Sequence, residues 1–270
     1  MTFAFGPALL FCPADRPDRY GKALDRADGV ILDLEDAVAP DARPAARSAL
    51  VATPLDPARV IVRVNETGSA DQAEDLAAAR AAGYMTVMVP KADARLDDAA
   101  FAGLAVIALC ETAAGVLDAR ALAERPGVVA LMWGAEDLVA SLGGTASRDA
   151  TGAYRDVARH ARSTILLAAG AAGIAAIDTV HLDLDDLDGL AAEAEDAAAV
   201  GFAATACIHP AHAAVIRRAY APTDAEVADA RRIIDAARTR GSVFRFEGRM
   251  VDGPVIRHAE AVLRRSPRVE

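Results

Sequence analysis

The chain has 270 residues, of which 53% are hydrophobic, so it is long enough to bury one large core. Its formal net charge of -10 argues against a nucleic-acid-binding protein, because binding to phosphates depends on a positively charged surface. No apolar run approaches the roughly 18 residues of a membrane span. The first residues also lack the basic start and the cleavage site of a signal peptide, which predicts a cytoplasmic protein.

Short apolar segments alternate with alanine-rich segments of helical character along most of the chain. This alternation predicts a parallel sheet with crossover helices, and its closed eight-stranded form is the (β/α)8 TIM barrel. A doubly wound open sheet stays an alternative, because a count of strands does not prove closure. We expect strands over residues 8–12, 30–34, 60–64, 86–90, 106–110, 128–134, 175–180 and 204–208.

The pattern changes after residue 208. Two helical runs lead into the short strand-like segment VFRFEG, and the last helical run is VIRHAEAVLRR. None of these segments has an obvious place in the barrel. We therefore predict a catalytic barrel domain over 1–220 and a C-terminal lid and oligomer-contact segment over 221–270.

Charged and polar residues follow seven of the eight predicted strands. The active site of such a barrel lies at the carboxyl ends of its strands. One charged residue at a strand end is usually a loop residue or a salt-bridge partner, but a set at seven strand ends predicts a site. The set contains Asp33, Glu35, Asp36, Arg63, Lys91, Glu111, Glu136, Asp137, Asp178 and His209.

The carboxylates in this set outnumber the basic residues, and a divalent metal would balance the excess. An oxygen-rich set without grouped His or Cys suits magnesium, or manganese, better than zinc. We predict that Glu111 and Asp137 bind the metal, with Asp33, Glu35 and Asp36 holding coordinated waters. The alternative is a structural ion-pair network.

The segment WGAEDL predicts a position where an anion could bind. Gly134 has no side chain, so a ligand carboxylate could approach the amides of Gly134 and Ala135, where the next helix begins. Arg63 would be the second clamp on the same carboxylate. Together with the metal, these residues predict a pocket for a small 2-oxo acid.

A local basic face follows the first strand. Arg16, Arg19 and Lys22 lie three residues apart and could hold the phosphates of a nucleotide-like group, although a solvated helix face explains them equally well. The sequence contains no G-x-S-x-G, no G-x-G-x-x-G after a strand and no Walker A motif, which disfavours serine catalysis and nucleotide sites.

Eight motifs occur along the chain in the order LFCPADRPDRYGKAL, VILDLEDAV, VIVRVN, VMVPKAD, VIALCETAAG, MWGAEDL, CIHPAH and FEGRMVDGPVIRHAE. This ordered set resembles the HpcH/HpaI aldolase family, in the branch similar to the citrate lyase beta subunit and related to malyl-CoA and citramalyl-CoA lyases. The resemblance implies a magnesium-binding (β/α)8 barrel that assembles as a homotrimer or a hexamer. It also implies cleavage or formation of a carbon–carbon bond between an acyl-CoA thioester and a 2-oxo acid.

The resemblance also implies roles for single residues. Glu111 and Asp137 correspond to the metal ligands, and Arg63 corresponds to the carboxylate clamp. Glu35 and Asp36 correspond to supports for the metal-bound waters.

Further roles concern the two ends of the chain. Arg16, Arg19 and Lys22 lie where relatives contact the CoA phosphates. Asp252 resembles an acid/base aspartate that relatives supply from a C-terminal lid, often to a neighbouring subunit. Two positions depart from the family pattern: Ala14 replaces a frequent Gly, and His212 replaces a frequent Gln.

Two rival functions stay open. One is a metal-independent Schiff-base aldolase that uses Lys91, one of only two lysines in the chain; otherwise Lys91 is an ion-pair partner of the carboxylates. The other is a non-autonomous citrate lyase-type subunit that acts with an acyl-carrier protein. Relatives also catalyse malate synthase-like condensation or thioester hydrolysis, and the motifs do not separate these activities.

Overall fold

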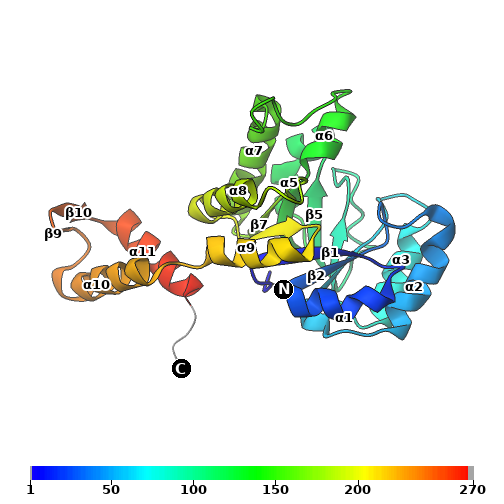
Figure 1. The fold of residues 1–270 in the computed structure, drawn as a ribbon, viewed down its shortest axis with the longest axis horizontal. Helices are drawn as coiled ribbons and strands as arrows, with labels where there is room; N and C mark the ends of the chain where they lie inside the picture. The colour runs from blue at the N-terminus through cyan, green and yellow to red at the C-terminus, as the bar shows by residue number, and fades with distance from the viewer. Residues whose placement is uncertain (1, 267–270) are drawn as a thin grey trace. The chain divides into compact units, whose positions relative to one another are not determined.

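The computed structural model describes residues 2–266, which form two compact units that divide between Ile216 and Arg217. The first unit is a barrel of strands with helices outside it (Figure 1). The second unit contains the C-terminal helices and a short hairpin. The predicted role of the C-terminal segment as a lid and oligomer contact stays a prediction.

Eight parallel strands form the closed barrel, and each pairs with the next in chain order. Parallel pairing of β1 with β8 closes the sheet, so the TIM-barrel prediction is confirmed and the open-sheet alternative is wrong. Each strand lies within two residues of its predicted range. The strands are β1 (Ala8–Pro13), β2 (Gly29–Asp33), β3 (Val60–Arg63), β4 (Thr86–Val89), β5 (Ala105–Cys110), β6 (Val128–Trp133), β7 (Ala175–Asp178) and β8 (Ala204–Cys207).

Alternate residues of the strands fill the barrel interior. Successive strand residues point to opposite faces, so one apolar set packs inside while the other packs against the helices. The inward set belongs to a single buried cluster that includes Leu9, Ile31, Ile61, Met88, Ile107, Leu109, Ala130, Met132, Ile177, Ala204 and Ala206. The phase of this set decides which residues at the strand ends face the barrel mouth.

The helices between the strands are rich in alanine, which has the highest helix propensity. Gly173 and Gly201 have positive φ angles of 70° and 111° and end two of these helices. The helices are α1 (Pro17–Arg26), η1 (Pro40–Ala42), α2 (Arg43–Ala52), η2 (Pro57–Arg59), α3 (Gln72–Ala81), α4 (Ala113–Leu117), α5 (Ala119–Ala123), α6 (Ala135–Ser141), α7 (Asp156–Ala172), α8 (Leu187–Val200) and α9 (Pro210–Tyr220), in which the first unit ends.

The second unit is a helical hairpin with its own small core. Helix α10 (Asp224–Arg240) begins with a capping box, in which Thr223 and Glu226 satisfy each other's backbone amides. The predicted strand-like segment is β9 (Phe244–Phe246), which pairs with a second strand, β10 (Arg249–Val251), that the sequence analysis missed. Helix α11 (Gly253–Arg265) completes the unit and packs on α10.

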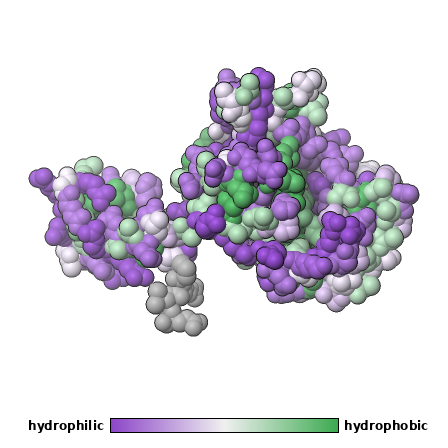
Figure 2. All heavy atoms as spheres, in the orientation of Figure 1, coloured by the Kyte–Doolittle hydropathy of each residue, from purple (hydrophilic) through white to green (hydrophobic). Residues whose placement is uncertain are grey.

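Two further observations agree with the composition. Within residues 2–266, no helix is long and apolar enough to cross a membrane. Cys12, Cys110 and Cys207 are free cysteines and are all buried in the first unit. Hydrophilic residues cover much of the visible face of the barrel unit (Figure 2).

Candidate functional site

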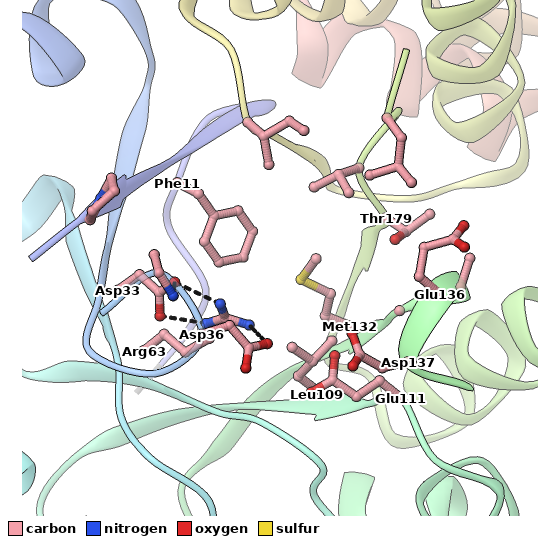
Figure 3. A pocket seen from close by; sticks show the side chains of 17 residues that line it. Phe11, Asp33, Asp36, Arg63, Leu109, Glu111, Met132, Glu136, Asp137 and Thr179 are labelled. Carbon is pink, nitrogen blue, oxygen red and sulfur yellow. Dashed lines mark hydrogen bonds and ion pairs between the residues drawn. The ribbon is translucent and has the colours of Figure 1, made fainter. Parts of the chain in front are cut away.

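A cavity of about 410 Å³ opens at the carboxyl ends of the barrel strands (Figure 3). Three of its charged residues continue the inward phase of the strands: Asp33 follows Ile31 by two positions, as Arg63 follows Ile61. Glu111 follows Leu109 in the same way. The cavity is lined by Phe11, Pro13, Asp33, Asp36, Ala37, Arg63, Leu109, Glu111, Met132, Gly134, Ala135, Glu136, Asp137, Thr179, Val180, Leu182 and Ile208.

Arg63 is fixed at the cavity wall by a bidentate pair with Asp33. Its Nε donates to Asp33 Oδ1 at 2.7 Å, and its Nη2 donates to Asp33 Oδ2 at 2.6 Å. The Asp33 carboxylate also accepts the backbone amides of Glu35 and Ala37. The Arg63 guanidinium lies over the ring of Phe11, 5.0 Å from its centroid. Both charged groups are buried, so the arginine is held in one orientation.

Nη1 of Arg63 is the nitrogen that Asp33 leaves unused. It lies 3.1 Å from Glu35 Oε2, as an ion pair without hydrogen-bond geometry, and 3.8 Å from Asp36 Oδ2. Because Nε and Nη2 are held by Asp33, Nη1 is the part of the guanidinium that a ligand carboxylate could engage. The predicted clamp therefore has a defined donor.

Lys91 links two carboxylates of the site. Its Nζ donates to Glu35 Oε1, while its backbone amide donates to Glu111 Oε1 at 3.0 Å. Lys91 has a φ of 48°, in the left-handed region that residues with a Cβ rarely adopt. The predicted pairing of Lys91 with a carboxylate is confirmed by the Glu35 contact.

The charge state of Lys91 follows from the same contact. Burial alone would lower the pKa of Lys91, but the Glu35 hydrogen bond and the nearby carboxylates raise it above its usual value. A protonated amine is not a nucleophile, so this environment disfavours a Schiff base at Lys91.

Glu111 and Asp137 form a pair of neighbouring carboxylates on the same side of the cavity (Figure 3). The Glu111 side chain is buried, and burial together with the charge of Asp137 raises the pKa of Glu111 to about 8, despite the opposing effect of Arg63. Arg63 and Lys91 are committed to Asp33 and Glu35, so neither balances the negative charge of the pair when both of its carboxyl groups are ionised.

The residues at this pair fit a divalent cation with a hard, oxygen-only ligand set. A buried carboxylate that is repelled by a second carboxylate beside it is stabilised by a cation between the two. Within residues 2–266 no cluster of three or more His, Cys, Asp or Glu side chains is arranged as a metal site. Water and substrate oxygens would therefore have to complete the coordination, which is the usual arrangement for magnesium.

Gly134 makes room for Glu111. A Cβ built on Gly134 would lie 2.9 Å from both Cβ and Oε2 of Glu111, closer than real contacts allow. The space that the sequence suggested for a ligand carboxylate is thus taken in part by Glu111. Helix α6 begins at Ala135, directly after Gly134, and carries Asp137 in its first turn. The predicted ligand contacts of Gly134 and Ala135 stay predictions.

Several predicted residues lie outside the barrel-mouth cavity. Arg16 precedes α1 and pairs with Asp18 through Nε and Nη2, each at 3.0 Å, while Arg19 and Lys22 are exposed on α1. Asp252 belongs to the second unit, where its Oδ1 accepts the Val255 amide at 3.4 Å and caps α11.

Two residues from the strand-end set, Asp178 and His209, do not line the cavity. Asp178 follows the inward residue Ile177 by one position, so its side chain points away from the barrel interior. It pairs there with Arg162 of α7 and accepts Trp133 Nε1 at 2.6 Å. His209 does not line the cavity either; its Nδ1 accepts the amide of Ala211.

The sequence analysis also missed most of the uncharged part of the lining. The missed residues are Phe11, Pro13, Ala37, Leu109, Met132, Thr179, Val180, Leu182 and Ile208. The inward phase of the strands could have predicted five of them. Each lies an even number of positions from a core residue in the same strand or in the strand just before it: Phe11, Leu109, Met132, Thr179 and Ile208.

Comparisons with known proteins agree with this geometry. Residues 8–210 match the family model described as HpcH/HpaI aldolase/citrate lyase. A citrate lyase subunit beta-like protein of Mycobacterium tuberculosis is 57% identical over 97% of this chain and 96% of its own length. The human mitochondrial citramalyl-CoA lyase is 29% identical over 94% of this chain and 83% of its own length.

The fold of one solved structure matches nearly the whole of this chain. It is protein CitE from M. tuberculosis in complex with magnesium, acetoacetate and coenzyme A, with a TM-score of 0.91 and 57% identity. The match covers 97% of this chain and 98% of that chain.

Proposed function

The chain belongs to the HpcH/HpaI aldolase/citrate lyase family, and on this premise we propose that it is a magnesium-dependent carbon–carbon lyase acting on CoA thioesters. It would cleave a 3-hydroxyacyl-CoA of the malyl-CoA, citramalyl-CoA or citryl-CoA type into an acyl-CoA and a 2-oxo acid, or run in reverse. The observation that carries the proposal is the buried carboxyl of Glu111, with Asp137 beside it and the fixed Arg63 nearby.

Glu111 and Asp137 would hold the magnesium, and Glu35 and Asp36 would support its waters. When bound, magnesium acts as a Lewis acid that stabilises oxygens gaining negative charge. The magnesium found with a CitE structure of 57% identity supports this assignment. Manganese has the same ligand preference and would substitute.

Arg63 would orient the carboxylate end of the substrate through Nη1, because Asp33 already fixes the rest of its guanidinium. Such preorganisation lets the substrate bind without reordering the arginine. Lys91 would act indirectly, by keeping Glu35 and Glu111 in place.

The proposed reaction moves two protons. The substrate hydroxyl loses one proton while the carbon–carbon bond breaks, and the acyl thioester leaves as an enolate that takes up one proton at carbon. We assign this second step to Asp252, which would be the base in the synthetic direction. The assignment is supported by the resemblance of M-V-D-G-P to the family motif.

We place the CoA phosphates at Arg16, Arg19 and Lys22. The exposure of Arg19 and Lys22 on α1 supports this placement, whereas Arg16 would exchange Asp18 for a phosphate. Coenzyme A in the related CitE structure supports a CoA ligand for this chain. We also propose a homotrimer or a hexamer built from trimers, which light scattering of the purified chain would test.

The second candidate function is a citrate lyase-type subunit that needs partner chains and an acyl-carrier protein. Its support is the citrate lyase subunit beta of Escherichia coli, which is 32% identical over 89% of this chain. Cleavage of a CoA thioester by the purified chain alone would exclude it.

The deciding experiment is a coupled assay of the purified chain with malyl-CoA, citramalyl-CoA and hydroxymethylglutaryl-CoA, with and without magnesium. We expect magnesium-dependent release of acetyl-CoA and a 2-oxo acid from malyl-CoA or citramalyl-CoA. Cleavage of hydroxymethylglutaryl-CoA would instead give acetoacetate, a 3-oxo acid, so this thioester tests selectivity for the 2-oxo acid. Glu111→Gln should be inactive, whereas Glu195→Gln, on an exposed position of α8, should match the unmodified chain. Failure to cleave all three thioesters in magnesium would refute the proposal.

A further inference from the structure

The loop between β7 and α8, residues 179–186, forms one wall of the barrel-mouth cavity. Thr179, Val180 and Leu182 line the cavity, and none of them is charged. Thr179 is buried and Val180 packs against the barrel core, but Leu182 is 49% exposed, so core packing does not hold the Leu182 end of this wall. Polar contacts outside the cavity must therefore hold this part of the loop in place.

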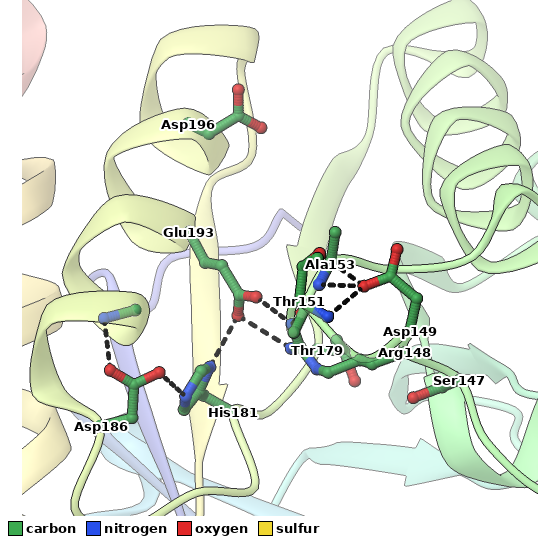
Figure 4. Close-up of polar contacts among 12 residues, drawn as sticks. Ser147, Arg148, Asp149, Thr151, Ala153, Thr179, His181, Asp186, Glu193 and Asp196 are labelled. Atoms are coloured by element: carbon green, nitrogen blue, oxygen red, sulfur yellow. Dashed lines mark hydrogen bonds and ion pairs between the residues drawn. The ribbon is translucent and has the colours of Figure 1, made fainter.

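His181 lies between two cavity-lining residues and points the other way. It is only 6% exposed, and its Nδ1 lies 2.9 Å from Oε2 of Glu193 on α8 (Figure 4). Its Nε2 lies 3.4 Å from Asp186 Oδ2, without hydrogen-bond geometry. Asp186 caps α8 by accepting the Gly189 amide at 2.8 Å. The imidazole thus joins both ends of the loop to one helix.

Glu193 extends the same network to another segment. Nη2 of Arg148 lies 3.1 Å from Glu193 Oε2, and Nη1 pairs with the other carboxylate oxygen (Figure 4). The Arg148 guanidinium also stacks 3.7 Å from the centroid of Tyr154. One carboxylate therefore holds both the histidine of the loop and the arginine of the segment before α7.

A second histidine holds the loop from the opposite side. Nε2 of His212, on α9, donates to the carbonyl oxygen of Leu184 at 3.3 Å. The His212 side chain is buried in the first unit, which fixes the donor end of this partly buried contact. The loop is consequently held at His181 and at Leu184, on either side of Leu182.

We propose that His181 is a positioning residue that fixes the wall formed by Thr179, Val180 and Leu182, and so sets the affinity for the acyl thioester. This inference rests on the proposed lyase function. His181 does not line the barrel-mouth cavity but two neighbouring cavities, so it acts on the substrate through the loop. The residues proposed to bind metal and carboxylate come from other strands, so their contributions should not change.

The test is a double-mutant cycle with citramalyl-CoA as the probe, followed by malyl-CoA and hydroxymethylglutaryl-CoA if the first is not cleaved. We would measure KM, kcat and magnesium binding for His181→Gln, Leu182→Ala and the double variant of the full chain. His160→Gln is the matched control, because His160 is an exposed histidine of α7. If His181→Gln does not fold, Glu193→Gln replaces it in the same cycle.

We expect His181→Gln to raise KM by on the order of 10- to 100-fold, because small misplacements of binding groups have effects of this size. The kcat should stay within about twofold, magnesium binding should not change, and the double variant should be no worse than the poorer single variant. His160→Gln should match the unmodified chain.

Three results would overturn the inference. An unchanged KM in His181→Gln would exclude a positioning role. Effects that multiply in the double variant would show that His181 and Leu182 act independently. Loss of kcat together with magnesium binding would show general structural damage. If the unmodified chain cleaves none of the three thioesters, the proposed function itself fails and the inference falls with it.

Discussion

Replacing Glu111 with Gln should remove the response of the protein to magnesium and change how its stability depends on pH. Burial and the charge of Asp137 raise the pKa of Glu111 from 4.5 to about 8. Gln keeps an oxygen that can accept the Lys91 amide, so the substitution removes the charge while preserving the shape of the site.

The sign of the pH effect follows from the raised pKa. Between pH 4.5 and about 8 the folded protein keeps a proton on Glu111 that the unfolded chain has released. This stabilising contribution is fully present below pH 4.5 and is lost as the pH rises through about 8. Since one pKa unit corresponds to ~1.4 kcal/mol, the whole effect is ~5 kcal/mol in the absence of a metal.

The assay is urea unfolding at about pH 5.5 and about pH 8.5, in EDTA and in magnesium. The unmodified chain should lose stability at the higher pH in EDTA and recover it in magnesium. Glu111→Gln should lack both responses, and Glu195→Gln should retain them. If Glu111→Gln still gained stability from magnesium, or lost stability with pH as steeply as the unmodified chain, the reasoning would be refuted.

Three more substitutions test other parts of the site. Gly134→Ala places a Cβ 2.9 Å from Glu111 Oε2, so activity should fall by at least about tenfold and magnesium binding should weaken in calorimetry; normal binding would contradict the packing account. Lys91→Met should lower kcat/KM without abolishing it, and borohydride with substrate should trap no adduct in the unmodified chain; a covalent adduct detected by mass spectrometry would support the Schiff-base rival. Asp252→Asn should abolish turnover while leaving 2-oxo-acid binding and thermal stability unchanged, because Asn caps a helix about as well as Asp; full turnover would remove Asp252 from the mechanism.

The sequence was sufficient for the barrel because its strands and helices have distinct apolar patterns. The same periodicity could have sorted the strand ends more sharply. Asp33 and Arg63 share the inward phase of Ile31 and Ile61, whereas Asp178 lies one residue out of phase with Ile177 and faces α7. Counting in steps of two from the inward apolar residues would therefore have predicted, from the sequence alone, that Asp33 faces the barrel interior and that Asp178 does not.

Other features depend on contacts between distant residues, which one sequence does not encode in a readable form. Arg148 and Glu193 are 45 positions apart, and no local pattern predicts their pairing. The left-handed backbone of Lys91, which turns its amide toward Glu111, arises from the tertiary structure rather than from local propensity. The roles assigned to Asp252 and to the basic residues of α1 stay predictions.

The most direct test of the account is the binding of Mn²⁺, a paramagnetic substitute for magnesium, followed by electron paramagnetic resonance. The unmodified chain should bind one Mn²⁺ per chain, and magnesium should displace it. Both Glu111→Gln and Asp137→Asn should lose this binding, because the two carboxylates are the proposed protein ligands. Unchanged Mn²⁺ binding in both variants would contradict the assignment of the metal site and, with it, the proposed chemistry.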